Sequence, residues 1–162
     1  MKFVSFLLKG QPKFGISDGN NITDLTGKIK GAQTLKELIS NKSLQEAKDF
    51  SKKNPGNINH NEIEYLPVIP NPGKIVCVGL NYSEHVKETG RTVEQNPVIF
   101  LRVPESQTAH KQPIQRPKVS ESLDYECEMA VIMGDAGKHI KPENALKHIV
   151  GYSCYNECTV RE

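Results

Sequence analysis

Short apolar runs separated by turn-forming residues occupy the first 26 positions of the chain. The runs are KFVSFLL near the start, then FGIS and NITDL, and the segments GQPK and SDGNN lie between them. Gly, Pro, Asn and Asp gathered between apolar runs are typical of tight turns. The pattern predicts a small antiparallel unit of strand, turn, strand and a further short strand.

The apolar residues then change to helical spacing. Among Lys and Glu residues they occupy positions Leu35, Leu38, Ile39, Leu44 and Ala47. This spacing predicts one or two amphipathic helices that reach about Lys52. The segment NPG at residues 54–56 follows, and these residue types end a helix.

The segment YLPVIPNPGK contains three prolines, and its rigid, donor-poor backbone suits a connection between units. It predicts a domain boundary, with residues 1–70 as a small N-terminal α+β domain and linker and residues 71–162 as a second domain. Directly after it, IVCVGL at residues 75–80 is a continuous apolar run. The run predicts a strand that is buried on both faces.

Composition narrows the classes of partner. The 162 residues carry 21 basic and 19 acidic side chains, a net charge of +2 that is too weak to attract nucleic acid by bulk electrostatics. No stretch approaches the roughly 18 continuous apolar residues of a membrane span, and the apolar run at residues 3–8 is shorter than a signal-peptide core. We therefore expect a cytoplasmic protein with neither a nucleic-acid nor a membrane partner.

The four cysteines show no paired C-x-x-C spacing, which favours reduced thiols buried as small apolar side chains. They are Cys77, Cys127, Cys154 and Cys158. An alternative is a zinc cluster of Cys154, Cys158 and the nearby His148, but that ligand set is incomplete.

The stretch DYECEMAVIMG alternates between two characters with period two, as a strand does. One face carries Asp124, Glu126 and Glu128, and the other carries Tyr125, Cys127, Met129, Val131 and Met133. One interpretation is a solvated acidic surface. However, the strand continues into AVIM, which we expect to be buried on both sides, so the carboxylates are expected to point into a partly enclosed site. There they would raise one another's proton affinity, and a bound cation would remove that penalty.

Carboxylate oxygens without paired thiolates or imidazoles match hard ions, which favours Mg²⁺, with Mn²⁺ or Ca²⁺ as substitutes. Two carboxylates do not complete a site, and Glu157, after the strand GYSCYN, is the candidate third donor. Between them, KPENALKHI has Pro142 at a helix start and apolar residues at helical spacing. The whole region therefore predicts strand, helix, strand.

His85 and Glu88 are three residues apart in NYSEHVKETG, which puts them on one face of a helical turn and within hydrogen-bonding reach. A carboxylate beside an imidazole fixes its tautomer and raises its basicity, as a general base requires. An ordinary surface helix is the alternative. The position directly after a predicted buried strand, with Gly90 at the flank, favours a working segment that moves as a lid.

Four motifs in order, KIVCVGLNYSEHVKE, PVIFLRVPES, DYECEMAVIMG and HIVGYSCYNECTVRE, resemble the fumarylacetoacetate hydrolase superfamily from about Lys74 to the last residue. This superfamily includes acylpyruvate hydrolases, oxaloacetate decarboxylases and 2-hydroxyhepta-2,4-diene-1,7-dioate isomerases. The resemblance implies an α+β fold in which a β-rich mixed sheet roll follows a small N-terminal α+β domain. It also implies a homodimer when the protein is full-length.

The resemblance further implies a metal-dependent enzyme that acts on small oxo acids. It makes Glu126, Glu128 and Glu157 the ligands of Mg²⁺, Mn²⁺ or Ca²⁺, and His85 with Glu88 the catalytic dyad. The implied reactions are carbon–carbon bond hydrolysis, decarboxylation, hydration or isomerisation through a metal-stabilised enolate. Glu157 stands where the family usually has Asp, a change that keeps the charge but lengthens the arm.

Family members continue beyond the position of Glu162 with a substantial further part of the fold. We expect the chain to be a fragment of a longer protein, or a shortened form whose catalytic fold is incomplete at the C-terminus. The shortened form gives an alternative function, a non-catalytic remnant that binds or assembles with a partner through exposed sheet edges. The sequence leaves the particular oxo acid and reaction open.

Overall fold

The computed structural model describes residues 1–88, 90 and 96–161, apart from the side chain of His85. Strands dominate, the helices are short, and every strand pairing in this part of the chain is antiparallel, whereas a mixed sheet was expected. Internal contacts divide the chain into two compact units, one made of Met1–Ile69 with Thr108–Glu162 and the other of Pro70–Gln107. None of the described helices is long and apolar enough to cross a lipid bilayer.

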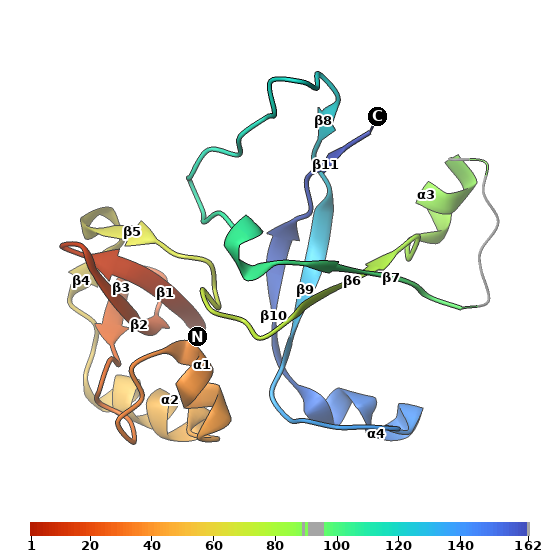
Figure 1. Cartoon of the computed structure of the whole chain (residues 1–162). Helices are drawn as coiled ribbons and strands as arrows, with labels where there is room; N and C mark the ends of the chain where they lie inside the picture. Colours follow the sequence, from red (N-terminus) through yellow and green to blue (C-terminus); the bar gives the residue numbers. More distant parts are fainter. Residues whose placement is uncertain (89, 91–95, 162) are drawn as a thin grey trace. The chain divides into compact units, whose positions relative to one another are not determined.

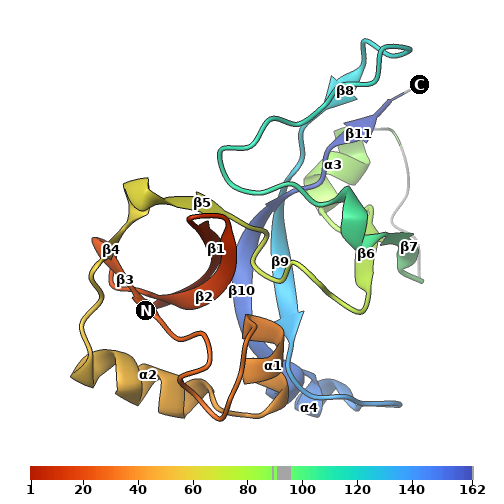
Figure 2. The same ribbon diagram turned by 60° about the vertical axis from the view of Figure 1, so that its left-hand side comes forward.

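A five-stranded sheet in the order β4-β3-β2-β1-β5 contains the N-terminal strands. Its members are β1 (Lys2–Leu8), β2 (Gln11–Ser17), β3 (Asn21–Asp24), β4 (Ile58–Asn59) and β5 (Ile63–Tyr65). Only the 3₁₀ turn His60–Glu62 separates the two edge strands along the chain, and the sheet curls round on itself (Figure 2). The strands predicted for the first 26 residues are confirmed.

The predicted helices are confirmed as α1 (Leu35–Ser40) and α2 (Leu44–Lys53), which lie beside this sheet (Figure 1). At the start of α1, the Thr34 side chain accepts a hydrogen bond from the Glu37 backbone N–H, and the Glu37 side chain accepts one from the Thr34 N–H. These helices and the sheet enclose a hydrophobic core. Its buried members are Phe14, Ile16, Leu25, Ile29, Ala32, Leu35, Leu38 and Ala47.

A hydrogen-bonded histidine links separate parts of the sheet. His60 Nε2 lies 2.9 Å from Ser17 Oγ at the end of β2, and His60 Nδ1 lies 2.7 Å from the Tyr65 hydroxyl on β5. Ser17 and His60 are 43 residues apart in sequence, so these contacts tie the end of β2 to the connection between β4 and β5 and to β5 itself.

The unit Pro70–Gln107 contains β6 (Ile75–Gly79), α3 (Ser83–Glu88), β7 (Val98–Arg102) and the 3₁₀ turn Pro104–Ser106. The prediction that β6 is buried on both faces is wrong, because Val76 and Val78 are 54% and 48% exposed. The physical reason is that β6 and β7 form, within the described residues, a sheet of two strands, and the face that carries Val76 and Val78 is left open to solvent.

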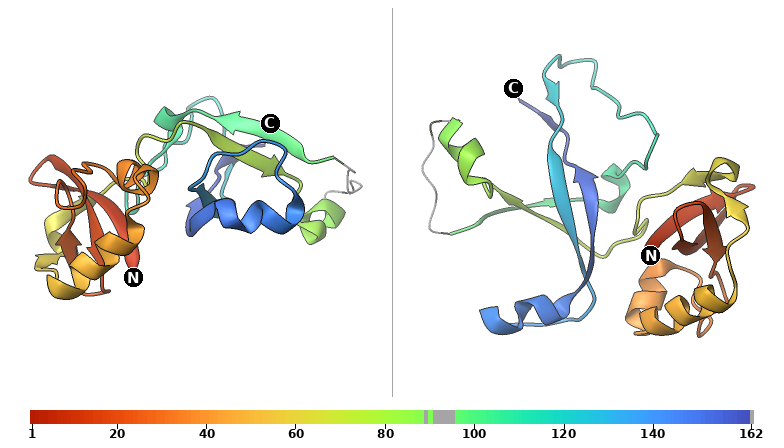
Figure 3. Two further views of the ribbon diagram at one scale, coloured as in Figure 1. Left: turned by 90° about the horizontal axis from the view of Figure 1, so that it is seen from below. Right: turned by 180° about the vertical axis from the view of Figure 1, so that it is seen from behind.

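The predicted strand, helix, strand arrangement is confirmed as β9 (Cys127–Met133), α4 (Pro142–Ala145) continuing into the 3₁₀ turn Leu146–His148, and β10 (Ile149–Asn156). Figure 3 shows β9 and β10 running side by side, with α4 at one end of the pair. The expectation that AVIM is buried on both sides is wrong. Val131 and Met133 are exposed while Ala130 and Ile132 are half-buried, because β9 and β10 form a sheet of two strands with only one sheltered face.

Candidate functional site

The acidic residues lie on one face of a continuous pair of antiparallel strands. Two short strands, β8 (Leu123–Asp124) and β11 (Thr159–Val160), extend the β9–β10 pair. Asp124 pairs with Thr159, and Glu128 pairs with Tyr155. Between these two ladders the Glu157 N–H donates to the Glu126 carbonyl oxygen over 2.9 Å, so one register runs through both.

Directly opposed residues of an antiparallel pair point to the same side, and side chains alternate between faces along each strand. The register therefore puts Asp124, Glu126 and Glu128 on one face of the sheet, as the alternation of residue types predicted. It adds Glu157, opposite Glu126, to the same face.

The acid-bearing face is the more sheltered of the two. Glu157 is 8% exposed and Glu128 is half-buried, whereas Met129 on the opposite face is 62% exposed. A fully solvated acidic row does not describe these residues. Cys127 and Cys154 lie on the exposed face, so the prediction that all the cysteines are buried is wrong for these two.

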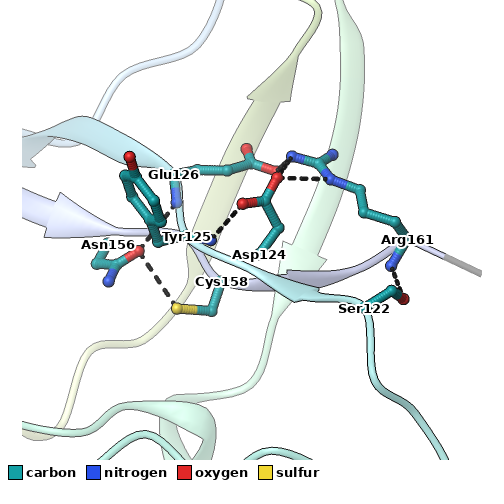
Figure 4. Close-up of polar contacts among 7 residues, drawn as sticks. All are labelled: Ser122, Asp124, Tyr125, Glu126, Asn156, Cys158 and Arg161. Atoms are coloured by element: carbon teal, nitrogen blue, oxygen red, sulfur yellow. Dashed lines mark hydrogen bonds and ion pairs between the residues drawn. The ribbon is translucent and has the colours of Figure 1, made fainter.

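A guanidinium lies against this row (Figure 4). Arg161 Nε and Nη2 donate to Asp124 Oδ2 over 3.2 Å and 3.0 Å, and Nη2 lies 2.8 Å from Glu126 Oε1. The Arg161 backbone N–H also donates to Ser122 Oγ over 3.1 Å. The hydrogen bond to Asp124 raises the pKa of Arg161, which keeps the guanidinium charged.

The last residue of β10 holds the backbone of the acidic strand. Asn156 Oδ1 accepts the Glu126 backbone N–H over 3.0 Å and also the Cys158 thiol, whose Sγ is 3.2 Å away. Glu126 is thus fixed at its backbone by Asn156 and at its carboxylate by Arg161.

Within residues 1–88, 90 and 96–161, no three His, Cys, Asp or Glu side chains are grouped closely enough to hold a metal ion. The convergence of Glu126, Glu128 and Glu157 on one ion therefore stays a prediction about their side chains, although the register already assigns them one face. The donor set fits a hard divalent cation, because it consists of carboxylate oxygens on adjacent strands of a sheltered surface. Neither thiol of the zinc alternative belongs to this face, since Cys154 and Cys158 alternate with it.

The predicted dyad lies on α3, in the other compact unit. Glu88 is exposed at the end of this helix, and the side chain of His85 lies outside the described part of the chain, so their contact stays a prediction. A cavity of about 170 Å³ lies in this unit and is lined by Val78, Gly79, Leu80, Asn81, Ser83, Asn96, Pro97 and Val98. Leu80 has a φ of +54°, a conformation that is rare for a leucine and concentrates at functional segments.

Arg161 and Ser122 belong to this network but were not predicted from the sequence as parts of it. A signal was available in the spacing. Arg161 lies four residues after Glu157, so in an uninterrupted strand the two side chains point to the same face. The pairing of residue 161 with residue 122 is a contact between distant segments, and the local pattern does not predict it.

Comparison with known proteins gives an independent view of the same residues. The family model described as fumarylacetoacetate (FAA) hydrolase C-terminal matches residues 74–162. The mitochondrial oxaloacetate tautomerase fahd2 of Xenopus laevis is 33% identical over 169 aligned positions, which cover 100% of this chain and 53% of that protein. The chain thus spans about half the length of this relative.

Solved structures share the fold. A fumarylacetoacetate hydrolase from Exiguobacterium antarcticum matches with a TM-score of 0.81 and 30% identity, over 99% of this chain and 57% of that one. Maleylpyruvate hydrolase from Sphingobium sp. SYK-6, solved in complex with manganese(II) ion and pyruvate, matches with a TM-score of 0.79 and 20% identity, over 99% of this chain and 60% of that one. At 20% identity the second match supports the fold alone.

Proposed function

This chain belongs to the fumarylacetoacetate hydrolase family, and on that premise we propose that it forms part of an enzyme that acts on small oxo acids with a bound divalent cation. One observation carries the proposal. The segment that matches the family contains the strand pair on whose sheltered face Glu126, Glu128 and Glu157 lie. An apolar strand pair would have no physical reason to keep three carboxylates on its less exposed side.

Glu126, Glu128 and Glu157 would hold Mg²⁺, with Mn²⁺ or Ca²⁺ as substitutes, because carboxylate oxygens are the donors these hard ions prefer. A divalent cation supplies Lewis-acid stabilisation of the negative charge that develops on the oxygens of an oxo acid. The Sphingobium maleylpyruvate hydrolase, which shares this fold, was solved with manganese(II) ion and pyruvate.

Residues of α3 would carry out the proton transfer of the reaction. In our proposal the imidazole of His85 accepts a proton from the carbon next to the keto group, or from water, and Glu88 orients the ring by accepting its other N–H. The helix follows the strained turn at Leu80, beside the 170 Å³ cavity of the same unit, and this supports a working segment there.

An oxo diacid of the oxaloacetate type is the substrate that the comparisons favour, because the Xenopus relative aligned over the whole of this chain is named an oxaloacetate tautomerase. The chain spans about half of that protein. The reaction is therefore proposed for a full-length enzyme of this family, and these residues would supply part of its active site.

The test combines ion binding with turnover. Electron paramagnetic resonance of free Mn²⁺ measures binding, and ultraviolet absorbance of the enol measures oxaloacetate tautomerisation. Glu126→Gln and Glu128→Gln should each lose both properties, because each removes a charged ligand. His85→Gln should bind Mn²⁺ like the wild type and lose turnover. Normal Mn²⁺ binding and turnover in Glu128→Gln would overturn the proposal.

A non-catalytic assembly role is the second candidate, and the exposed apolar face of the β9–β10 pair favours it. Met129, Val131 and Tyr152 are all exposed on that face. If this role holds, sedimentation should show association that weakens in Met129→Glu and Tyr152→Glu and that persists in Glu128→Gln. A chain that remains monomeric at high concentration contradicts it.

A further inference from the structure

We propose that Arg161 is the positioning residue of the candidate metal centre: it holds the Glu126 carboxylate through one oxygen so that the other oxygen faces the cation. The inference rests on the proposed function, because it needs the cation that Glu126, Glu128 and Glu157 would bind. It assigns Arg161 a role through Glu126, with no contact of its own to the ion.

The contact to Glu126 involves one carboxylate oxygen. Arg161 Nη2 lies 2.8 Å from Glu126 Oε1, while its contacts to Asp124, through Nε and Nη2, both end on Oδ2. Figure 4 shows the guanidinium facing both carboxylates. A carboxylate held in this way keeps a second oxygen for another electropositive partner.

The guanidinium also relieves a charge problem. Asp124, Glu126 and Glu128 occupy successive positions on one strand face, roughly 6.5 to 7 Å apart along the strand, and unscreened carboxylates at that spacing repel one another. The single positive charge of Arg161 offsets only part of the negative charge of these carboxylates. The row therefore keeps a net negative charge that can attract a divalent ion. A metal-ligating carboxylate oriented by a hydrogen-bond donor is a recurrent feature of metal sites.

Arg161 is anchored independently of Glu126. Its backbone N–H donates to Ser122, and two of its side-chain N–H groups serve Asp124, leaving a single contact for Glu126. The single contact at 2.8 Å is compatible with support of the ligand by a planar, always charged group, whose donor geometry a lysine ammonium does not reproduce.

The experiment measures the Mn²⁺ dissociation constant of the full chain by electron paramagnetic resonance for wild type, Arg161→Gln, Arg161→Lys and Glu128→Gln. Lys13→Gln is the matched control, since it breaks a 2.6 Å ion pair with Asp24 in the N-terminal sheet. We expect Arg161→Gln to weaken Mn²⁺ binding about 10- to 100-fold. The Mn²⁺ affinity of Arg161→Lys should lie between those of wild type and Arg161→Gln, because an ammonium restores the charge but not the planar donor geometry of the guanidinium. Lys13→Gln should bind Mn²⁺ like the wild type.

The line shape of bound Mn²⁺ provides a readout that a merely structural role would not move, since it reports the symmetry of the ligands. We expect it to change in Arg161→Gln and to return toward the wild type in Arg161→Lys. If Arg161→Gln does not fold, as judged by circular dichroism, Arg161→Lys carries the test through its affinity and line shape.

The outcomes separate the two claims. If Glu128→Gln loses Mn²⁺ binding while Arg161→Gln binds as tightly as wild type, or more tightly, the positioning role is overturned and the metal centre stands. If wild type binds no Mn²⁺, or Glu128→Gln binds it normally, the proposed function fails and the role of Arg161 falls with it.

Discussion

Glu126 illustrates how a single residue combines several local constraints. Its backbone N–H is held by Asn156, its carbonyl accepts the Glu157 N–H, and its carboxylate contacts Arg161. Alternation along the strand predicted which face Glu126 takes, because side-chain direction in a strand depends on the backbone alone. The partners could not be predicted in the same way, since they lie about 30 residues away and depend on the register.

Asp24 gives a prediction about pH at this scale. Burial alone would raise the pKa of Asp24, but the hydrogen bond from Lys13, at 2.6 Å, and those from Thr26 outweigh burial and hold it below its ordinary value. A lowered carboxyl pKa stabilises the fold above the ordinary value of 3.8, and this contribution disappears as pH falls through the folded-state pKa.

We therefore expect the free energy of unfolding to decline less steeply below about pH 5 in Asp24→Asn than in wild type. The difference in the total loss should be under about 1 kcal/mol, because the Lys13–Asp24 pair is partly exposed. Urea denaturation at several pH values measures this. Lys13→Gln should flatten the same part of the profile, and the double variant should add little further change. Additive effects of the two substitutions would contradict the linkage.

At the scale of elements, the hydrophobic pattern predicted which of these strands and helices form, but it predicted wrongly that β6 and the AVIM part of β9 are buried on both faces. The three N-terminal strands, both early helices and the strand, helix, strand series follow from local spacing. Burial depends on which neighbours cover a strand, and this depends on tertiary structure. IVCVGL and AVIM have the composition of central strands, yet within the described residues each lies in a sheet of two strands.

The capping box of α1 yields a prediction for an element. Thr34 and Glu37 satisfy each other's backbone N–H groups, which an isolated first turn leaves without partners. Thr34→Ala should lower the free energy of unfolding by about 1 kcal/mol, as measured by urea denaturation followed by circular dichroism. Ser43, at the start of α2, makes no side-chain cap, so Ser43→Ala is the control and should cost less. Equal losses would indicate that the box contributes nothing specific.

At the scale of the whole molecule, the hydrophobic core is concentrated near the N-terminus. The buried cluster spans Phe14 to Ala47, and the half-buried residues packed on it extend only from Phe3 to Ile69. The β6–β7 and β9–β10 pairs instead expose apolar side chains. Stability should therefore be carried mainly by the first part of the chain.

This distribution predicts that residues 1–69 fold on their own. The isolated segment should show a cooperative thermal transition by far-ultraviolet circular dichroism. Leu38→Ala should lower its stability by about 2 to 5 kcal/mol, because Leu38 is fully buried. A segment without a cooperative transition would show that the core needs the rest of the chain, and would contradict the proposed domain boundary near residue 70.

The uninterrupted register from Asp124–Thr159 to Glu128–Tyr155 has a consequence for how this region can evolve. Substitutions at Thr159 or Val160 leave Arg161 on the acid-bearing side, whereas deleting or inserting one residue between Glu157 and Arg161 turns the guanidinium to the opposite side. The length of this four-residue interval is thus under stronger constraint than its composition, and indels there should be far rarer among functional homologues than point changes.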